Sequence, residues 1–511
     1  MSAPFFFLFI LVTAISATRV AAASATTKPN VLFIAVDDLN DWVIGSQRGI
    51  QTPHLDRLRA RGTLFANAHC ASPSCHPSRL AVMTGVRPST SGIDHNVYSR
   101  SQASWRTGPD SGTGALAKAV VLSQHFRSHG WRAAGVGKIF HGLQWVDGSE
   151  NDPEAWDDYF PSALDQIPPQ IRPDDLIEDA ARGITGERPL GGGLGRRGQV
   201  FGANPIQAPD AAMSDTHVAD WAIGQLRQAR AEQPLFLAVG FFRPHIPWEV
   251  PQKYFDAYPL HEIRRPKVLA GDLDDTHGHN RVPWHDWVLA NEDKFQMWGR
   301  LIQGYQASIT FMDAQLGRVL DALDASPQAK NTIVVLWSDH GMHLGEKQNW
   351  EKFTLWERST RVPLIIAGPG VSRPGSQVSS PASLIDLYPT LCELAGIPIP
   401  PQCEGTSLRS QLQDPAAPRT MPAITTQTLA KQSGHAVRDD RWRYIRYFDG
   451  FEELYDHASD PDEFTNLAHH AAFEKEKTRL RGWLERVRAP LDGKYPGMAQ
   501  KSGKNQKKGA N

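Results

Sequence analysis

Runs of apolar, largely β-branched residues that end abruptly in polar residues recur along this chain and constrain its fold most strongly. Residues 31–36, VLFIAV, are followed by two aspartates, and residues 234–242 and 331–341 repeat the pattern. Residues 361–370 contain a further run of the same kind. Because continuous apolar strands are typically buried on both faces, these runs predict a sheet that is covered by helices on each side.

Helical periodicity lies between the predicted strands. Residues 296–323 place apolar side chains on one face at three- and four-residue steps, and residues 54–62 and 207–230 show a weaker form of this pattern. Strands that alternate with helices predict an α/β fold with a large mixed, mostly parallel sheet sandwiched by helices. In such folds ligands bind beyond the carboxyl ends of the strands, which is where the aspartates lie.

The length and the changes in composition along the chain predict more than one domain. A chain of 511 residues exceeds one ordinary domain, so we expect an α/β domain over residues 28–400 and a small C-terminal α+β domain over residues 405–490, which includes a helix at 471–488. The stretch 145–205 is rich in Gly, Pro and charge and is expected to be a loop. Residues 491–511 are basic and poor in apolar side chains, which predicts a disordered tail.

The first 25 residues resemble a signal peptide. Residues 5–15 are apolar but too short to span a bilayer, and residues 21–25 offer A-x-A cleavage sites, although the start lacks Lys and Arg. No later segment of about 18 apolar residues follows. The mature chain is therefore expected to be exported, either periplasmic or secreted, and free of the membrane after signal removal.

Charge and cysteine content narrow the possible partners. The chain has 54 Lys and Arg against 55 Asp and Glu, so it has no general attraction to nucleic acid or anionic lipid. Any bound anion must instead be held by a local cluster. Export permits disulfides, and Cys392 and Cys403 could close a short loop, although spacing alone does not show that their Cβ atoms meet.

Acidic residues follow two of the apolar runs: Asp37 and Asp38 follow the first, and Asp339, together with His340, follows the third. Adjacent carboxylates beside a buried strand repel one another and lose hydration unless a cation lies between them. A helix cap with one solvated carboxylate would also explain the first pair. Three carboxylates with few soft ligands indicate a hard divalent cation, Ca²⁺ or Mg²⁺, whereas a His ligand is compatible with several metals.

One cysteine, Cys75, lies in the stretch 72–85, SPSCHPSRLAVMTG, with Arg79 four residues further along. A catalytic thiol, half of a disulfide, or a residue that the cell converts into another group would each explain it. Other candidate residues for an anion site occur in loops or near strand ends: Lys138, His141, His245 and Lys352. Each alone is commonly a satisfied polar residue or a solvated charge, but together with Arg79 they would form the anion pocket that displacement at a sulfate or phosphate requires.

Several motifs resemble those of one enzyme family. Residues 75–79, CHPSR, followed by LAVMTG, match the sulfatase signature Cys-x-Pro-Ser-Arg. The strand-end DD, the SDHG and LGE block, GK-x-x-H and the C-terminal ELYDHASDPDEFTNLA occur in the order found in type I sulfatases of the alkaline phosphatase superfamily. The resemblance extends from about residue 28 to residue 470, and GKIFH and RPHIPW further resemble the iduronate-2-sulfatase branch. It implies an alkaline-phosphatase-like fold and a sulfuric ester hydrolase.

In that family the signature cysteine is converted to formylglycine, so the resemblance implies that a formylglycine-generating machinery modifies Cys75. One hydroxyl of the hydrated aldehyde attacks sulfur, and loss of the proton from the other then expels sulfate. A thiol nucleophile would instead need a depressed pKa, which surrounding cations could supply. The family match also places Asp37, Asp38, Cys75 and Asp339 at the Ca²⁺ site, with His340 where the family more often has Asn or Gln.

The resemblance also implies roles for the cationic residues. Arg79 and Lys138 would steady the formylglycine hydroxyl and the sulfate. His141 would take the proton whose loss releases sulfate, and His245 would be the leaving-group acid or a sulfate contact. Lys352 would hold a sulfate oxygen and shield the bridging oxygen. A histidine in an acid role fits a working pH near its pKa.

Contacts to a sugar are expected from residues near this site. Trp350 could stack on a sugar ring, and His95 and Asn96 follow the signature helix and could line the mouth of the site. Lys431 and His435 could reach a carboxylate of the sugar, as in the iduronate-type branch. Ordinary packing or a solvated surface would explain each of these residues equally well.

These features predict hydrolysis of a sulfate ester on a saccharide. A 2-O-sulfated uronic acid, or a related sulfated sugar of an algal polysaccharide or a glycosaminoglycan, is the expected substrate. A phosphonate or phosphate ester hydrolase of the same superfamily would use a similar pocket. A third interpretation is a non-catalytic binder of sulfated glycans in which Cys75 stays unconverted, but such a binder would have no need of the proton-transfer histidines.

Overall fold

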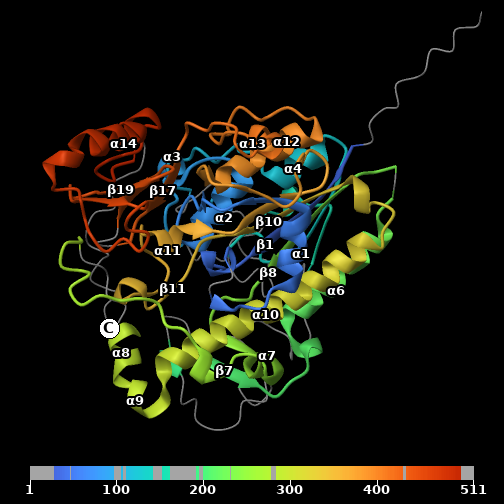
Figure 1. The fold of residues 1–511 in the computed structure, drawn as a ribbon. Helices are drawn as coiled ribbons and strands as arrows, with labels where there is room; N and C mark the ends of the chain where they lie inside the picture. Colours follow the sequence, from blue (N-terminus) through green and yellow to red (C-terminus); the bar gives the residue numbers. More distant parts are fainter. Residues whose placement is uncertain are drawn as a thin grey trace, which may run out of the picture.

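An eight-stranded sheet forms the centre of the computed structural model, and helices cover both of its faces (Figure 1). The structure describes residues 28–45, 48–96, 105–106, 111–141, 152–160, 191–194, 200–230, 232–277, 284–429 and 433–495. From one edge to the other, the strands of the central sheet are β15 (Ser376–Val378), β2 (Gly62–Phe65), β14 (Leu364–Ala367), β10 (Thr332–Ser338), β1 (Asn30–Val36), β8 (Leu235–Phe241), β4 (Arg132–Gly137) and β5 (Asp158–Phe160).

The central sheet is mostly parallel, with one strand reversed. Strand β14 runs antiparallel to both of its neighbours, β10 and β2. The remaining neighbouring pairs are parallel. The sheet therefore confirms the predicted α/β class with a mixed, mostly parallel sheet. Because β10, β1, β8 and β4 are parallel, their carboxyl ends all lie at the same end of the sheet.

Each face of the sheet carries its own helical layer. Helices α1 (Pro53–Arg61), α6 (Ser214–Gln228) and α10 (Met297–Asp324) cover one face, and α2 (Cys75–Thr84), α4 (Leu122–Ser128) and α12 (Leu387–Ala395) cover the other. Strand β1 serves both layers because its side chains alternate, with Leu32, Ile34 and Val36 in the first core and Val31, Phe33 and Ala35 in the second. All seven residues of β1 are consequently buried, which explains its continuous apolar sequence.

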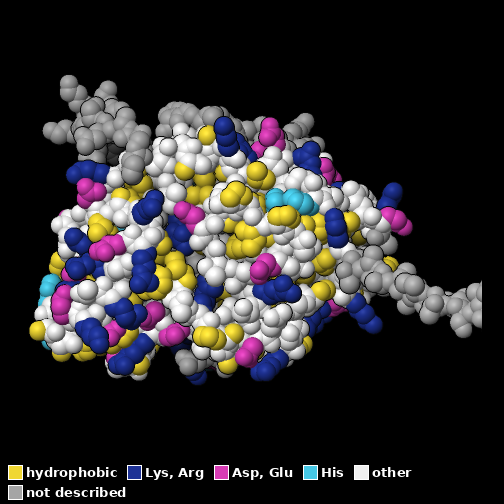
Figure 2. Space-filling model, turned by 90° about the horizontal axis from the view of Figure 1, so that it is seen from above, with side chains coloured by type: hydrophobic (Ala, Val, Ile, Leu, Met, Phe, Trp, Pro, Cys, Tyr) yellow, Lys and Arg dark blue, Asp and Glu magenta, His cyan; other side chains and the backbone are white. Residues whose placement is uncertain are grey.

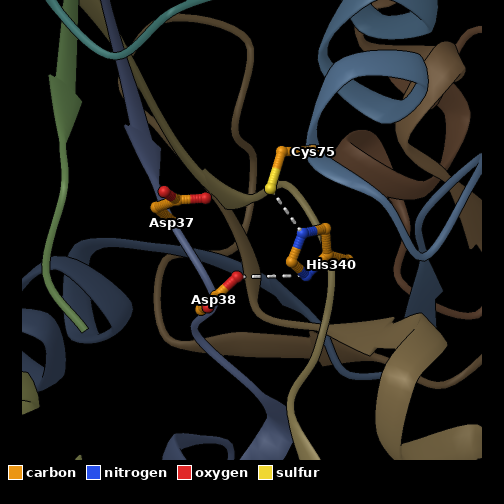
Figure 3. A group of neighbouring side chains, drawn as sticks. All are labelled: Asp37, Asp38, Cys75 and His340. Carbon is orange, nitrogen blue, oxygen red and sulfur yellow. Dashed lines mark hydrogen bonds and ion pairs between the residues drawn. The ribbon is translucent and has the colours of Figure 1, made fainter. Parts of the chain in front are cut away.

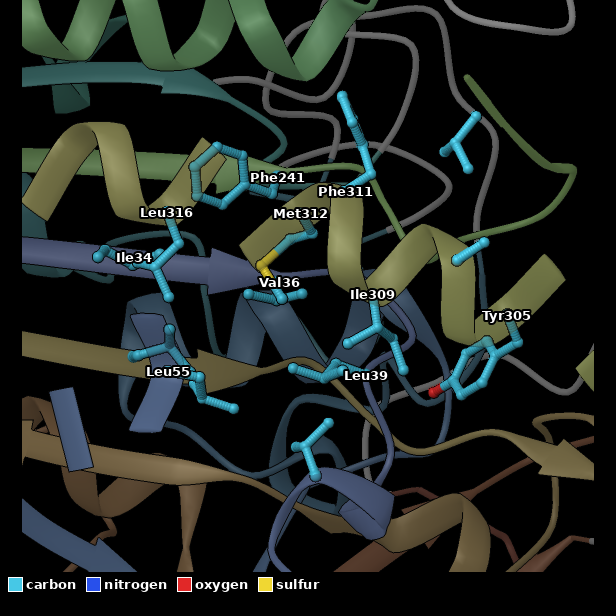
Figure 4. Close-up of a cluster of buried hydrophobic side chains, with 14 of the residues drawn as sticks. Ile34, Val36, Leu39, Leu55, Phe241, Tyr305, Ile309, Phe311, Met312 and Leu316 are labelled. Carbon is cyan, nitrogen blue, oxygen red and sulfur yellow. The ribbon is translucent and has the colours of Figure 1, made fainter. Parts of the chain in front are cut away.

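Helix α10 is the longest element of the first layer and follows the predicted periodicity. Its residues Ile309, Met312 and Leu316 pack over Ile34 and Val36 of β1 (Figure 4). The spacing of three and four residues brings these side chains onto one face of the helix, and that face is buried against the sheet.

Shorter elements connect the layers. The short helices are α3 (Pro88–Ser91), α7 (Gln252–Asp256), α8 (Trp284–Ala290), α9 (Glu292–Phe295), α11 (Glu357–Thr360) and α13 (Arg409–Gln413). Three small sheets consist of β11 (His343–Leu344) with β12 (Trp350–Glu351), of β13 (Arg361–Val362), β3 (Ala68–His69) and β16 (Ala382–Ser383), and of β6 (Gly191–Leu194), β7 (Val200–Ile206) and β9 (Trp248–Pro251).

The C-terminal part of the chain folds into a four-stranded antiparallel sheet and one helix. The sheet follows chain order, β17 (Ala423–Gln427), β18 (Gly434–Arg438), β19 (Trp442–Tyr447) and β20 (Glu452–Asp456), and α14 (Glu474–Arg486) packs on one face. On the other face, Ile445 and Tyr455 pack against Leu355 and Trp356 of the loop before α11. This sheet therefore lies against the part of the chain that follows β12.

Two loop and tail predictions need correction. Within the stretch 145–205, which was expected to be a loop, the described residues include a 3-10 helix at Pro153–Ala155, β5, β6 and most of β7. Strand β6 lies in the glycine-rich LGGGLGRRG. Pairing with β7 explains why a glycine-rich segment is extended there. The tail predicted from residue 491 begins in an ordered form, because Leu491 packs against the C-terminal core and the Tyr495 hydroxyl donates to Asp94.

Other predictions fall outside the described residues or receive a different answer. The segment 1–25 and the tail beyond residue 495 lie outside the described residues. Among the helices that are described, none is both long and apolar enough to cross a bilayer.

Cys392 and Cys403 are free thiols, so the structure does not contain the disulfide considered for this pair. On the face shown in Figure 2, basic and acidic side chains are intermingled over the coloured surface, in keeping with the balanced composition.

Candidate active site

Three aspartates meet at the carboxyl ends of β1 and β10. The parallel register places Val36 opposite Ser338, and this brings Asp37, Asp38 and Asp339 side by side. The backbone N–H of Asp339 donates to the carbonyl of Val36 at 3.2 Å, and the backbone N–H of Asp38 donates to Asp339 Oδ1 at 3.1 Å. The acidic cluster is thus a direct product of strand pairing, at the edge where the sequence placed it.

The backbone of Asp38 adopts the left-handed conformation, with φ of 62°. A non-glycine residue pays a steric cost in this region and persists there only when its surroundings hold it. The Tyr305 hydroxyl of α10 donates to the Asp38 carbonyl at 2.8 Å and accepts from the Asn40 N–H at 2.9 Å. Helix α10 therefore fixes the turn that aims the Asp38 carboxylate into the site.

Strand β4 delivers the first cation, Lys138, to the same edge. The Lys138 N–H donates to the Gly240 carbonyl of β8 at 3.0 Å, which continues the ladder one residue beyond β4. A Cβ at position 240 would lie 2.2 Å from the Lys138 carbonyl oxygen, so only glycine permits this approach. The Lys138 ammonium forms an ion pair with Asp37 Oδ2.

Helix α2 begins at Cys75 and carries the second cation, Arg79, one turn later. Arg79 is fully buried, its Nε donates to Asp339 Oδ2 at 2.8 Å, and its Nη2 lies 3.3 Å from Asp37 Oδ1. The Ser78 hydroxyl donates to the Asp339 carbonyl at 2.5 Å. These contacts attach the start of α2 to the strand ends, so that residue 75 faces the aspartates.

The Cys75 side chain lies among ionisable groups and is 1% exposed. Its Sγ is 3.1 Å from His340 Nε2, and the His141 side chain is a further neighbour of this sulfur. His340 Nδ1 lies 3.0 Å from the Gly341 carbonyl oxygen and 3.5 Å from Asp38 Oδ1. Figure 3 shows the sulfur and this imidazole pointing toward each other beside the two consecutive aspartates.

The remaining cationic candidates approach from loops. Lys352 Nζ lies 2.8 Å and 2.9 Å from the two carboxylate oxygens of Asp38. The loop that carries it contains Glu351 and Phe353 with positive φ, so the chain turns sharply on both sides of Lys352. His245 Nε2 is 3.9 Å from Asp38 Oδ2. The ring of His141 stacks edge-on against that of His76.

Charge compensation sets the protonation of the aspartates. Burial alone would raise the pKa of Asp37, but Lys138, His245 and Arg79 hold it well below its usual range. Burial raises the pKa of Asp339, and the nearby Asp37 adds to this effect against Arg79. Asp37 is therefore a fixed negative charge, whereas Asp339 depends on Arg79 to remain ionised.

The same cations favour an anion at position 75. Burial alone would raise the pKa of the Cys75 thiol, but Lys352, Lys138 and His340 lower it well below its ordinary value. Burial would also lower the pKa of His340, but Asp339, Cys75 and Asp38 raise it to about 9. Position 75 thus lies where negative charge is stabilised, as an incoming oxyanion or tetrahedral anion requires.

The donor set fits a hard cation only in part. One ligand atom from each of Asp37, Asp38, Cys75 and His340 lies within 4.8 Å of the others. The two carboxylates are the oxygen ligands that Ca²⁺ and Mg²⁺ prefer, whereas a thiol sulfur and an imidazole suit softer metals. Replacement of the sulfur by the oxygens of an aldehyde hydrate would improve the fit to Ca²⁺. Asp339, a predicted ligand, instead directs Oδ2 to Arg79 and Oδ1 to the backbone N–H groups of residues 38 and 340.

Two of the proposed sugar contacts occupy buried positions instead. Trp350 is 1% exposed, and its indole packs edge-on against Trp298, so its ring is not available to stack on a sugar in this conformation. His435 is fully buried between the Thr426 hydroxyl at 2.9 Å and the Pro490 carbonyl at 3.1 Å. Both residues are therefore part of the packed interior.

The other sugar-contact candidates lie nearer the surface. The His95 side chain is 48% exposed, and its Nδ1 is 3.0 Å from Asp94 Oδ1. Asn96 Oδ1 accepts from the backbone N–H of His76 at 3.0 Å, and His76 directly follows Cys75 in the chain. Lys431 lies outside the described residues.

Sequence reasoning did not identify two supporting residues, Tyr305 and Ser78. Tyr305 belongs to the apolar face of the long helix, and its hydroxyl partner at Asp38 becomes visible only in three dimensions. Ser78 lies inside the signature, but its role in holding the Asp339 carbonyl depends on how α2 docks on the sheet.

Comparison with known proteins agrees with this geometry. A model of the sulfatase family matches residues 29–397, and a model of the C-terminal region of N-sulphoglucosamine sulphohydrolase matches residues 345–490. A sulfatase of Formosa agariphila is 38% identical over 479 residues, which cover 91% of this chain and 88% of that protein. Iduronate 2-sulfatase of Homo sapiens is 29% identical over 437 residues, which cover 76% and 73% of the two chains.

Solved structures share the fold. A phosphonate monoester hydrolase from Silicibacter pomeroyi matches with a TM-score of 0.70 at 22% identity, covering 92% of this chain and 97% of that chain. The fold is accordingly the alkaline-phosphatase-like one that the motifs implied. Because the family model spans most of the chain and a relative at 38% identity covers nearly all of it, the chain belongs to the sulfatase family and is a sulfuric ester hydrolase.

Proposed function

We propose that this sulfatase hydrolyses a sulfate ester on a saccharide, using a formylglycine derived from Cys75 and a bound Ca²⁺. The observation that carries the proposal is the position of Cys75, which starts a helix at the strand ends and lies among cations, histidines and aspartates. A site that stabilises negative charge at residue 75 suits a nucleophile that must meet a sulfate. Mg²⁺ is an alternative for the metal because the carboxylates accept either ion.

The surrounding side chains divide the work of binding and proton transfer. Lys138 and Lys352 now neutralise Asp37 and Asp38, and their ammonium groups lie where sulfate oxygens would approach. Arg79 makes no such approach, because it is fully buried behind the aspartates and holds their charges in place. We assign it a positioning role toward residue 75 rather than direct contact with sulfate.

Two histidines are our candidates for proton transfer. His141 is a neighbour of the side chain of residue 75 and could take the proton whose loss releases sulfate. His245 Nε2 lies 3.9 Å from Asp38 Oδ2 and could protonate the leaving sugar oxygen. Formylglycine, once formed, supplies a carbon that carries two hydroxyls, one to attack sulfur and one to expel sulfate. The metal would be held by Asp37 and Asp38 and would supply a positive charge beside the sulfate.

A 2-O-sulfated uronic acid or a related sulfated polysaccharide fragment is the proposed substrate. The name of the relative iduronate 2-sulfatase supports this class. Since Trp350 and His435 are buried, recognition of the sugar falls to residues nearer the surface, such as His95 and Asn96.

A phosphonate or phosphate ester hydrolase is the second candidate, and the structural match to a phosphonate monoester hydrolase favours keeping it. Parallel assays with an aryl sulfate, an aryl phosphate diester and sulfated oligosaccharides separate the two. We expect turnover of the sulfate esters, and exclusive turnover of phosphoesters would refute the sulfatase activity. Lys138→Ala should abolish turnover of every substrate, whereas the matched change of an exposed lysine, Lys330→Ala, should leave it unchanged.

Peptide mass spectrometry around Cys75 tests the modification. Conversion to the aldehyde predicts a defined mass decrease relative to the thiol in the active protein. Full activity with an unmodified Cys75 would overturn the formylglycine mechanism and favour a thiolate nucleophile.

We further propose how the chain is organised and delivered. Residues 1–25 are a signal peptide, and the mature protein is exported to the periplasm or the medium. Residues 28–400 form the catalytic domain, residues 405–490 form the small C-terminal domain, and residues beyond the ordered Tyr495 form the tail. The family matches over residues 29–397 and 345–490 support a division near residue 400, although they overlap. Sequencing the N-terminus of the secreted protein tests the cleavage site.

A further inference from the structure

The active site of the unconverted chain contains a donor set that differs from the one that follows conversion. Before conversion, residue 75 offers sulfur, His340 offers nitrogen, and Asp37 and Asp38 offer oxygen, with the ligand atoms all within 4.8 Å of one another. The sulfur and His340 Nε2 are only 3.1 Å apart, and all four side chains are at most 1% exposed (Figure 3). Four converging donors in a closed site are the arrangement of a tetrahedral metal centre.

The chemistry of these donors selects against Ca²⁺. Ca²⁺ takes six to eight oxygen ligands, whereas Zn²⁺ is bound by Cys sulfur, His nitrogen and carboxylate oxygen in fours. A thiolate in the ligand set moves the preference to soft or borderline metals. The ion expected from the family and the sulfur at position 75 therefore do not fit together.

Neighbouring contacts prepare two of the donors. His340 Nδ1 lies 3.0 Å from the Gly341 carbonyl oxygen, which orients the ring and turns Nε2 toward the sulfur. Such a backbone partner for the second ring nitrogen is typical of metal-binding histidines. Asp37 Oδ1 is buried and has no hydrogen-bond partner within the described residues, with Arg79 Nη2 at 3.3 Å. That oxygen is therefore open to a further ligand.

We propose that the chain with unconverted Cys75 is a zinc-binding protein, in which Asp37, Asp38, Cys75 and His340 hold one Zn²⁺. Zinc takes the place of the thiol proton, which is released to solvent, and one oxygen of each carboxylate turns from its lysine to the metal. Conversion of Cys75 to the aldehyde removes the sulfur, and the pocket then prefers hard cations that bind oxygen ligands, such as Ca²⁺. This inference concerns the unconverted chain and does not rest on the proposed hydrolysis.

The experiment uses the full chain produced without conversion, with an intact thiol at residue 75 verified by peptide mass. Cys392 and Cys403 are neighbours of each other and could also bind zinc, so all measurements use a chain in which both are replaced by alanine (Cys392→Ala/Cys403→Ala). The protein is refolded with ZnCl₂ or CoCl₂ and dialysed, and bound metal is measured by elemental analysis. We expect one equivalent of zinc and, with Co²⁺, a thiolate-to-cobalt charge-transfer absorbance. We also expect Cys75 of the native protein to react more slowly with iodoacetamide when zinc is bound than when it is absent.

Variants separate this site from other donors in the chain. His340→Ala should weaken zinc binding by at least about tenfold, and Cys75→Ser should lose the cobalt charge-transfer band. His457→Gln is the matched control, because Glu357, His457 and Glu463 form a similar cluster whose carboxylates are already paired with Arg443. That variant should keep the full equivalent of zinc.

Three results would overturn the proposal. One is the absence of a charge-transfer band in the unconverted chain with all four proposed ligands intact, once its circular dichroism spectrum has shown that the protein is folded. The second is displacement of zinc by an equal concentration of Ca²⁺. The third is loss of the equivalent in His457→Gln with retention in His340→Ala, which would assign the metal to the other cluster. Activity of the converted enzyme is measured separately, so failure here leaves the hydrolase proposal standing.

Discussion

Replacement of Lys352 by methionine tests the charge balance of the site. The Lys352 ammonium lies 2.8 Å and 2.9 Å from the oxygens of Asp38, and the two side chains are 5% and 0% exposed. Methionine keeps much of the length and apolar volume of lysine but removes its charge. The Asp38 carboxylate then remains buried without its main cation, while its left-handed backbone and the Tyr305 hydrogen bond are unchanged.

The magnitude follows from the burial of this pair. Removal of one partner from a buried ion pair costs about 3–5 kcal/mol, because the remaining charge is left uncompensated. A metal that binds Asp38 can supply the missing positive charge, and a ligand at one hundred times its Kd stabilises the folded state by about 2.7 kcal/mol. In the wild type, Lys352 and the metal compete for the same carboxylate, so metal stabilises the wild type less than the variant.

The assay is urea denaturation followed by tryptophan fluorescence, on converted protein, with EDTA and with saturating Ca²⁺. We expect Lys352→Met to lose about 3–5 kcal/mol of unfolding free energy in EDTA and to recover a large part of it with Ca²⁺. Lys347→Met is the matched control. Lys347 is also buried and pairs with Asp272 at 2.9 Å, but this pair lies outside the cluster of metal-binding candidates. Its loss should be comparable in EDTA and insensitive to Ca²⁺.

Two outcomes would refute this reasoning. Equal recovery of both variants with Ca²⁺ would mean that the metal stabilises the protein elsewhere. No destabilisation of Lys352→Met in EDTA would mean that other groups, such as His245 or His340, compensate the charge of Asp38.

Further predictions concern the nucleophile, a buried histidine and the C-terminal segment. Cys75→Ser should stay folded and bind substrate but stop after one turnover with a stable sulfate ester, so multiple turnovers would count against the aldehyde hydrate. Burial lowers the pKa of His435 to about 4, so the unfolded chain, with a histidine pKa of about 6.5, takes up the proton first as pH falls. The unfolding free energy is therefore unaffected by His435 above about pH 6.5 and falls as the pH drops toward 4, by about 2 kcal/mol between pH 7 and pH 5. In His435→Gln this part of the pH dependence should be absent from denaturation curves. Tyr495→Phe deletes a hydrogen bond to Asp94 and should cost about 1 kcal/mol in unfolding free energy, together with faster hydrogen exchange at residues 94–96.

The core of the site was readable in the sequence because its determinants are local. Cys75 and Arg79 are four residues apart, and on a helix this spacing places both on one face. Asp37 and Asp339 each follow an apolar strand, and in a parallel sheet strand ends of this kind meet at one edge. The same periodicities predicted α10 and the strand at β1 nearly to the residue.

Other features depended on contacts between distant segments. The reversed direction of β14 does not show in its apolar sequence, because a strand buried on both faces reads the same in either direction. The extended conformation of β6 arises from its pairing with β7, which the composition of the segment does not reveal. The free thiols of Cys392 and Cys403 depend on side-chain geometry that spacing could not supply.

The candidate sugar contacts show the same limit most clearly. Trp350 and His435 have side chains suited to binding a sugar, yet each is buried among partners from elsewhere in the chain. The sequence by itself determined the chemistry that is present at the strand ends and on the first turn of α2, since periodicity and spacing act over a few residues. Only the tertiary structure decided which polar side chains face the site, because burial and hydrogen-bond partners are set by packing between segments hundreds of residues apart.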